Sequence, residues 1–108
     1  MRAMLIAMTV AVFPTFAQAD CFENLGNTGC PHLETFKLSE LRQLSCQNLW
    51  HVRNSIYNHR GYCFKTAAAQ QVFDNSDCFV TNASAIKLNQ HEQKNISRIV
   101  KVEKEKSC

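Results

Sequence analysis

Six cysteines, and the short apolar segment that precedes them, constrain the fold of this chain most. Residues 1–19 carry one positive charge at Arg2, an apolar run over residues 4–13 and small residues before Asp20. This pattern is typical of a cleavable signal peptide, and its apolar run is shorter than the roughly 20 residues that a membrane-spanning helix needs. Cleavage after Ala19 would leave 89 of the 108 residues. The sequence therefore predicts a periplasmic or secreted protein with no transmembrane anchor after cleavage.

All the cysteines lie beyond the predicted cleavage site, at Cys21, Cys30, Cys46, Cys63, Cys78 and Cys108. An even number of cysteines behind a signal peptide indicates disulfide bonds formed in an oxidising compartment. A zinc site is disfavoured because no Cys-x-x-Cys pair occurs and the four histidines do not fall at metal-ligand intervals. The sequence thus predicts no metal and no cofactor. A chain of this length has a marginal hydrophobic core, which three bridges of about 2–4 kcal/mol each would stabilise.

The charge balance argues against one class of partner. Without Arg2 the chain has eleven basic and nine acidic residues. Nucleic-acid-binding domains usually show a strong basic excess, so we expect no nucleic-acid partner. Lysine and glutamate alternate near the end of the chain, over residues 101–106, which is typical of a solvated helix face.

The most regular segment is an amphipathic helix that we expect to begin near Ser45 and to end near Arg60. Serine is a good N-cap residue, and Gly61 stands where a left-handed C-cap requires glycine. Apolar residues recur at helical spacing within this segment, so its predicted buried stripe is Leu49, Val52, Ile56 and Tyr57.

Two further helices complete the predicted fold, a small all-α domain of three helices. Thr66 can cap a short alanine-rich helix over residues 67–73. Asn89 and Glu92 resemble a capping box that opens the last helix, whose Ile96, Ile99 and Val100 are expected to face inward. Residues 38–44 form a short helical lead-in, and residues 79–88 are expected to be irregular except for a β-prone Phe79-Val80 pair.

The order of these helices predicts the disulfide pairs. If the first and last helices pack antiparallel, the start of one meets the end of the other, which pairs Cys46 with Cys108. Cys63 and Cys78 then bracket the middle helix, and Cys21 with Cys30 closes an N-terminal loop. The predicted organisation is a signal peptide over residues 1–19, this loop over residues 20–37 and a helical domain over residues 38–108.

Part of the first helix carries a resemblance to a known family. The segment that carries it, called the signature below, is Arg53-Asn54-Ser55-Ile56-Tyr57-Asn58-His59-Arg60-Gly61-Tyr62-Cys63-Phe64. It resembles the signature of the YARHG domain family in its cysteine-bearing form, over roughly residues 38–108. The matching positions are Arg53, Asn54, Tyr57 and Gly61, whereas Asn58-His59-Arg60 stands where the family name has Ala-Arg-His. The resemblance implies a small extracytoplasmic bacterial domain and suggests binding to the cell envelope.

The leading functional hypothesis is a binding module for an envelope component or a protein partner. Tyrosine, tryptophan and arginine carry much of the energy of protein interfaces, and this helix is rich in them. The candidate binding surface is Trp50, Arg53, Tyr57, His59, Arg60 and Tyr62. Arg53 has two alternative roles, because it could lie between the rings of Trp50 and Tyr57 or pair with a carboxylate such as Asp77 or Glu103.

Two other functions stay open, a small envelope hydrolase or an inhibitor of one, and a structural accessory. His51, Ser55 and His59 share one side of the helix at intervals of four residues. The two histidines lie about 12 Å apart along the axis, too far to bind one metal ion. No acidic residue on this helix orients an imidazole, so we expect an exposed polar face and no catalytic residue.

Overall fold

The computed structural model describes residues 21–108, so the predicted signal peptide lies outside the described residues. The elements are α1 (Leu38–Leu41), α2 (Cys46–His59), α3 (Ala67–Val72), the 3₁₀ turn η3 (Ala83–Ala85) and α4 (Gln90–Glu105). Within residues 21–108 there is no strand, and a single isolated bridge joins Tyr62 to Val80. The described part has four α-helices where three were predicted, because the lead-in forms its own helical turn against α4.

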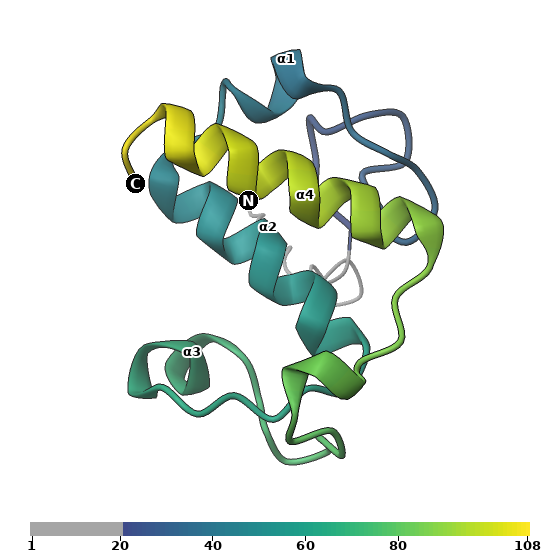
Figure 1. The fold of residues 1–108 in the computed structure, drawn as a ribbon, viewed down its shortest axis with the longest axis vertical. Coiled ribbons are helices and arrows are strands. Elements are labelled where there is room, and N and C mark those ends of the chain that lie inside the picture. Colours follow the sequence, from purple (N-terminus) through teal and green to yellow (C-terminus); the bar gives the residue numbers. More distant parts are fainter. Residues whose placement is uncertain (1–20) are drawn as a thin grey trace, which may run out of the picture.

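α2 and α4 pack antiparallel across the centre of the molecule (Figure 1). The predicted caps determine where the helices begin. The Ser45 hydroxyl accepts a hydrogen bond from the Asn48 N–H at 3.1 Å, and Asn89 and Glu92 form the reciprocal capping box of α4. The Thr66 hydroxyl caps α3 in the same way as Ser45 caps α2.

The main core lies between α1, α2 and α4. Three of the four residues of the predicted stripe of α2 are confirmed, since Leu49, Val52 and Ile56 are buried there with Ile99 of α4. The fourth, Tyr57, is only partly buried and packs against the second core described below. Val102, which was not predicted to face inward, is also fully buried, whereas Val100 is only partly buried. The last turns of α4 are therefore amphipathic, although the sequence alternates charges there.

The segment before α1 belongs to the same core. Phe36 has no exposed surface and Leu25 has 3%. The buried side chain of Asn95 holds this segment to α4: its Oδ1 accepts from the Phe36 N–H at 2.8 Å, and its Nδ2 donates to the carbonyls of Pro31 and Glu34. The Asn95 amide thus supplies hydrogen-bond partners to backbone groups of this segment, which has no helix or strand to pair them.

The N-terminal loop closes around a carboxylate. The backbone N–H groups of Asn27, Thr28 and Gly29, together with the Thr28 hydroxyl, donate to the side chain of Glu34. These bonds, led by that of the Thr28 hydroxyl, lower the pKa of Glu34 from 4.5 to about 2. The loop is therefore fixed by a hydrogen-bonded anion as well as by the Cys21–Cys30 bridge.

A second, smaller core lies on the other side of α2. Phe64, Ala69 and Phe73 are buried there, with the rings of Phe64 and Phe73 stacked at 5.0 Å. The second core attaches α3 to α2. There the ring centroids of Phe73 and His51 are 5.3 Å apart.

The disulfides are Cys21–Cys30, Cys46–Cys108 and Cys63–Cys78, which are the pairs that the helix order predicts. Cys46–Cys108 joins the start of α2 to the end of the chain, and Cys63–Cys78 brackets α3. Among residues 21–108, no helix combines the length and the apolar character needed to cross a membrane.

Candidate functional site

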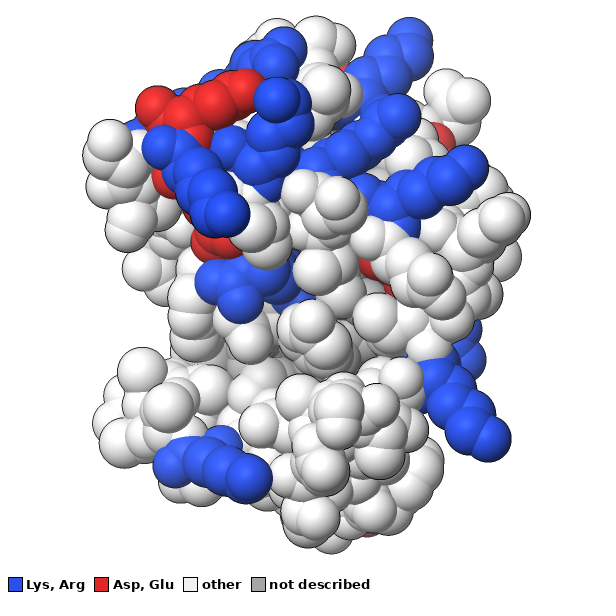
Figure 2. All heavy atoms as spheres, in the orientation of Figure 1, with Lys and Arg blue, Asp and Glu red and all other residues white. Residues whose placement is uncertain are grey.

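An open groove lies between the start of α2, α3 and the end of α4. Its volume is about 750 Å³. Figure 2 shows the molecule hollowed between the part that carries α4 and the part that carries α3. The groove is lined by Cys46, Gln47, Trp50, Arg53, Thr66, Ala68, Gln71, Val72, Glu103 and Cys108. Ligand sites of proteins usually fall within this range of volumes.

Two of the residues predicted to bind, Trp50 and Arg53, line this groove. Trp50 is half-buried, with its ring 6.0 Å from that of Phe73 in the second core. No hydrogen bond of the Trp50 Nε1–H to another described residue is present, and this donor is not buried. The indole therefore offers both an aromatic face and a donor to a molecule in the groove.

Arg53 pairs with Glu103, one of the two carboxylates that were expected as partners. Its Nε and Nη2 donate to the two carboxylate oxygens at 2.9 and 3.1 Å. This bidentate pair holds α2 against α4, while Nη1 has no hydrogen-bond partner among the described residues. With 27% of its side chain exposed, Arg53 both joins two helices and presents N–H donors to the groove.

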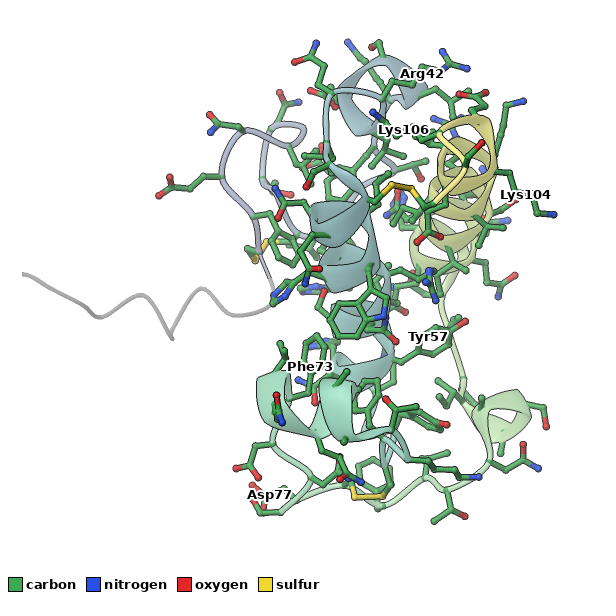
Figure 3. All side chains as sticks on the ribbon, turned by 90° about the vertical axis from the view of Figure 1, so that its left-hand side faces the viewer. Arg42, Tyr57, Phe73, Asp77, Lys104 and Lys106 are labelled. Atoms are coloured by element: carbon green, nitrogen blue, oxygen red, sulfur yellow. A yellow bond between two sulfur atoms is a disulfide. The ribbon has the colours of Figure 1, made fainter. Side chains whose placement is uncertain are left out.

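Tyr57 and Tyr62 lie against the second core. Their ring centroids are 6.2 Å apart, and the Tyr62 ring meets that of Phe64 edge-on at 5.0 Å. In Figure 3 the Tyr57 side chain projects from the lower part of α2, on the opposite side from Phe73. Both tyrosines are part-exposed, and neither lines the groove.

His59 and Arg60, the other two candidate binding residues, also lie outside the groove. The ring of His59 stacks on that of His32 at 4.6 Å. Arg60 reaches the start of α4, where its Nε and Nη2 donate to the carboxylate of Glu92 at 2.7–2.9 Å. These hydrogen bonds raise the pKa of the Arg60 guanidinium. The structure thus separates the six predicted residues into three locations.

The other signature positions have structural contacts. Gly61 has φ +87°, and the bonds from its N–H to the Asn58 carbonyl and from the Tyr62 N–H to the Tyr57 carbonyl form a Schellman cap. The side-chain amide of Asn54 donates to the carbonyl of Trp50, one turn earlier in α2, at 2.9 Å. Most of the signature therefore shapes the end of α2.

The polar face of α2 does not form a catalytic arrangement. Ser55 is only 2% exposed, and its hydroxyl donates to the carbonyl of Val52 at 2.8 Å. His51 lies between the rings of Phe22 and Phe73, and burial lowers its pKa. The prediction of an exposed polar face was wrong for Ser55, which is buried, whereas His59 on the same side is exposed.

Most of the groove could not be found from the sequence. Its α3 wall begins a few residues after the signature and its α4 edge comes from the end of the chain, and only the folded chain places Ala68 and Glu103 near Trp50. Val72 is apolar yet 46% exposed beside the groove, but exposure is a property of the folded structure, so the sequence contains no signal for this wall.

Residues 21–108 thus form a small helical domain with two cores, three disulfides and an open groove between α2, α3 and α4. A family model, described as the YARHG domain, matches residues 31–104. The chain therefore belongs to the YARHG domain family, as its signature suggested. No curated protein and no solved structure matches the chain.

Proposed function

We propose that this protein is exported and acts as a non-catalytic binding module, with the groove as its ligand-binding site. The observation that carries the proposal is that Trp50 and Arg53 line the same open groove, and that the Nη1 of Arg53 has no hydrogen-bond partner among residues 21–108. Tryptophan and arginine are the residue types that contribute most to binding energy when they lie together.

The chemistry of the groove fits an elongated ligand with polar groups. Its walls supply the amide side chains of Gln47 and Gln71 and the apolar surface of Ala68 and Val72. A ligand could stack on the indole of Trp50 while its oxygen atoms accept hydrogen bonds from the amides. An envelope polymer or an extended segment of a protein partner has this combination of groups.

Two observations support binding over catalysis. The buried Ser55 hydroxyl is bonded to a helix carbonyl, which removes the strongest nucleophile of the polar face. All six cysteines are paired, so no free thiolate is available for redox chemistry.

Export is supported by the same bridges. Disulfides persist in oxidising compartments and are rare in the cytosol. The N-terminal pattern of residues 1–19 and membership of the YARHG family agree with an extracytoplasmic location, either the periplasm or the medium.

The proposal can be tested through Trp50, which is the only tryptophan in the chain and lies in the groove. We would titrate the oxidised protein with soluble fragments of the cell envelope, and with proteins captured from the same extract, while recording tryptophan fluorescence. A saturable shift in the emission is the expected result.

Two neighbouring alanines of α3 provide a matched pair of variants. Ala68 lines the groove, whereas Ala67 is exposed on the same helix outside it. Ala68→Arg should fill the groove and abolish the shift, and Ala67→Arg, with the same added charge, should leave it unchanged. Equal effects of the two variants, or binding that never changes the emission of Trp50, would contradict the proposal.

A further inference from the structure

Basic side chains gather on the outward side of α4 and around α1. Figure 2 shows them over that part of the molecule, with few acidic side chains between them. Lys94 and Lys101 are seven residues apart and Lys104 follows three residues later, so they share the side of α4 that faces away from α2. We call this set the basic face; its members are Lys37, Arg42, Lys94, Arg98, Lys101 and Lys104, and all except the half-buried Arg98 are exposed.

The carboxylates of the described residues leave this face largely unneutralised. Glu105 is the acidic residue of its outward side, and it pairs with Arg42 at 3.0 Å and with Lys101 at 3.7 Å. Glu92 and Glu103 face α2, where arginines bind them. Glu34 and Glu40 accept hydrogen bonds from the N-terminal loop.

Basic side chains therefore gather in one part of the molecule, although the formal net charge of the whole chain is only +3. Figure 3 places Arg42 and Lys104 at one end and Asp77 at the opposite end. A balanced composition therefore coexists with a concentrated positive potential at one end.

The shape of the basic face limits the partners that it can bind. From Lys94 to Lys104 the helix extends about 15 Å, and the surface is the convex outside of a helix. Ser97, Val100, Lys101, Lys104 and Glu105 line a shallow hollow there, with no aromatic ring among them. Stacking on nucleic-acid bases and insertion into a bilayer both depend on aromatic or large apolar side chains.

We propose that the basic face docks the domain on the surface of a bilayer that contains anionic phospholipids. A planar layer of phosphates can contact all the lysines of a convex helix at once, without requiring one fixed geometry. Lysines near such a surface contribute to binding roughly independently, and the attraction falls off within a Debye length of about 10 Å. This inference does not rest on the groove, whose lining includes none of the residues of the basic face.

The test is sedimentation of the oxidised protein with vesicles at low and high salt. Vesicles of phosphatidylcholine with added phosphatidylglycerol should retain the protein at low salt and release it at high salt. Vesicles of phosphatidylcholine alone should not retain it.

Two double variants that lose the same net charge distinguish binding through the basic face from a general effect of net charge. Lys94→Gln with Lys104→Gln should weaken partitioning about thirtyfold, since each lysine contributes about fivefold. Lys65→Gln with Lys87→Gln, two exposed lysines outside this face, should weaken it much less. Circular dichroism would verify that both variants are folded.

Three results would overturn the proposal. They are equal losses in the two double variants, binding that does not depend on the anionic lipid, and tighter binding to a single-stranded oligonucleotide than to the anionic vesicles at the same salt.

Discussion

The ion pair between Arg60 and Glu92 should contribute more to stability than any other pair in the described structure. Glu92 has only 1% of its side chain exposed, whereas Arg60 has 33%. Replacing Arg60 by alanine leaves the buried carboxylate with the Asn89 N–H as its remaining donor. Removing one partner of a buried pair costs about 3–5 kcal/mol, and water that enters beside the half-exposed site favours a value of about 3 kcal/mol.

The opposite substitution should cost less. In Glu92→Gln, the amide oxygen can still accept the capping bond from the Asn89 N–H. The unpaired Arg60 is partly exposed, so water can solvate it, and we expect a loss of about 1 kcal/mol. The double variant Arg60→Ala with Glu92→Gln should then be more stable than Arg60→Ala alone, because no buried charge remains.

Urea denaturation of the oxidised protein, followed by circular dichroism at neutral pH, would measure these differences. Arg42→Ala is the matched control, because its pair with Glu105 is exposed on both sides and should contribute little to stability. A loss in Arg60→Ala no larger than that in Arg42→Ala would refute the reasoning. A loss in Glu92→Gln larger than that in Arg60→Ala would also refute it.

Two further predictions concern the turns. Gly61→Ala should cost about 1–2 kcal/mol, because an alanine strains φ +87° and its Cβ would meet the ring of Phe79; an unchanged melting temperature would show that the cap tolerates a side chain. The hydrogen bonds that lower the pKa of Glu34 to about 2 should stabilise the fold above pH 4.5 and lose this effect as the pH falls toward 2. After allowance for solvent screening we expect about 1 kcal/mol, and Glu34→Gln should flatten the dependence of stability on pH in that window. Identical pH profiles for the variant and the wild type would contradict this.

Local patterns in the sequence predicted the helices well. Ser45, Thr66 and Asn89 act as caps, and Gly61 ends α2 in the left-handed conformation, because these residues bond to backbone groups within a few positions of themselves. The disulfide pairs also followed from the antiparallel order of α2 and α4. A cap depends on neighbouring residues, and a disulfide between helix ends depends on the order of the helices; both can be read from a sequence.

Contacts between distant segments were not predictable in the same way. Asn95 reads as an ordinary polar residue of an exposed helix, yet it is fully buried and binds the segment before α1. Phe36 and Leu25 complete the main core from a region that was expected to be a separate loop. Nothing in their local periodicity indicates which helix they meet.

The candidate site was predicted only in part, because the residues of the signature have different roles in the structure. Trp50 and Arg53 line the groove, but Arg60 and Gly61 close the end of α2 and bind it to α4. A residue type that suits an interface, such as arginine, suits an interhelical ion pair equally well. Only the position of a carboxylate, here Glu92, decides between the two roles.

The groove itself follows from how a short chain distributes its apolar residues. The main core lies between α1, α2 and α4, and the second core attaches α3 to the opposite side of α2. The Cys63–Cys78 bridge holds the α3 segment in place without a large apolar interface to α4. A larger interface there would bury Trp50 and fill the space beside it. In this domain the disulfides therefore stabilise an arrangement that leaves Trp50 and Arg53 on the wall of an open groove.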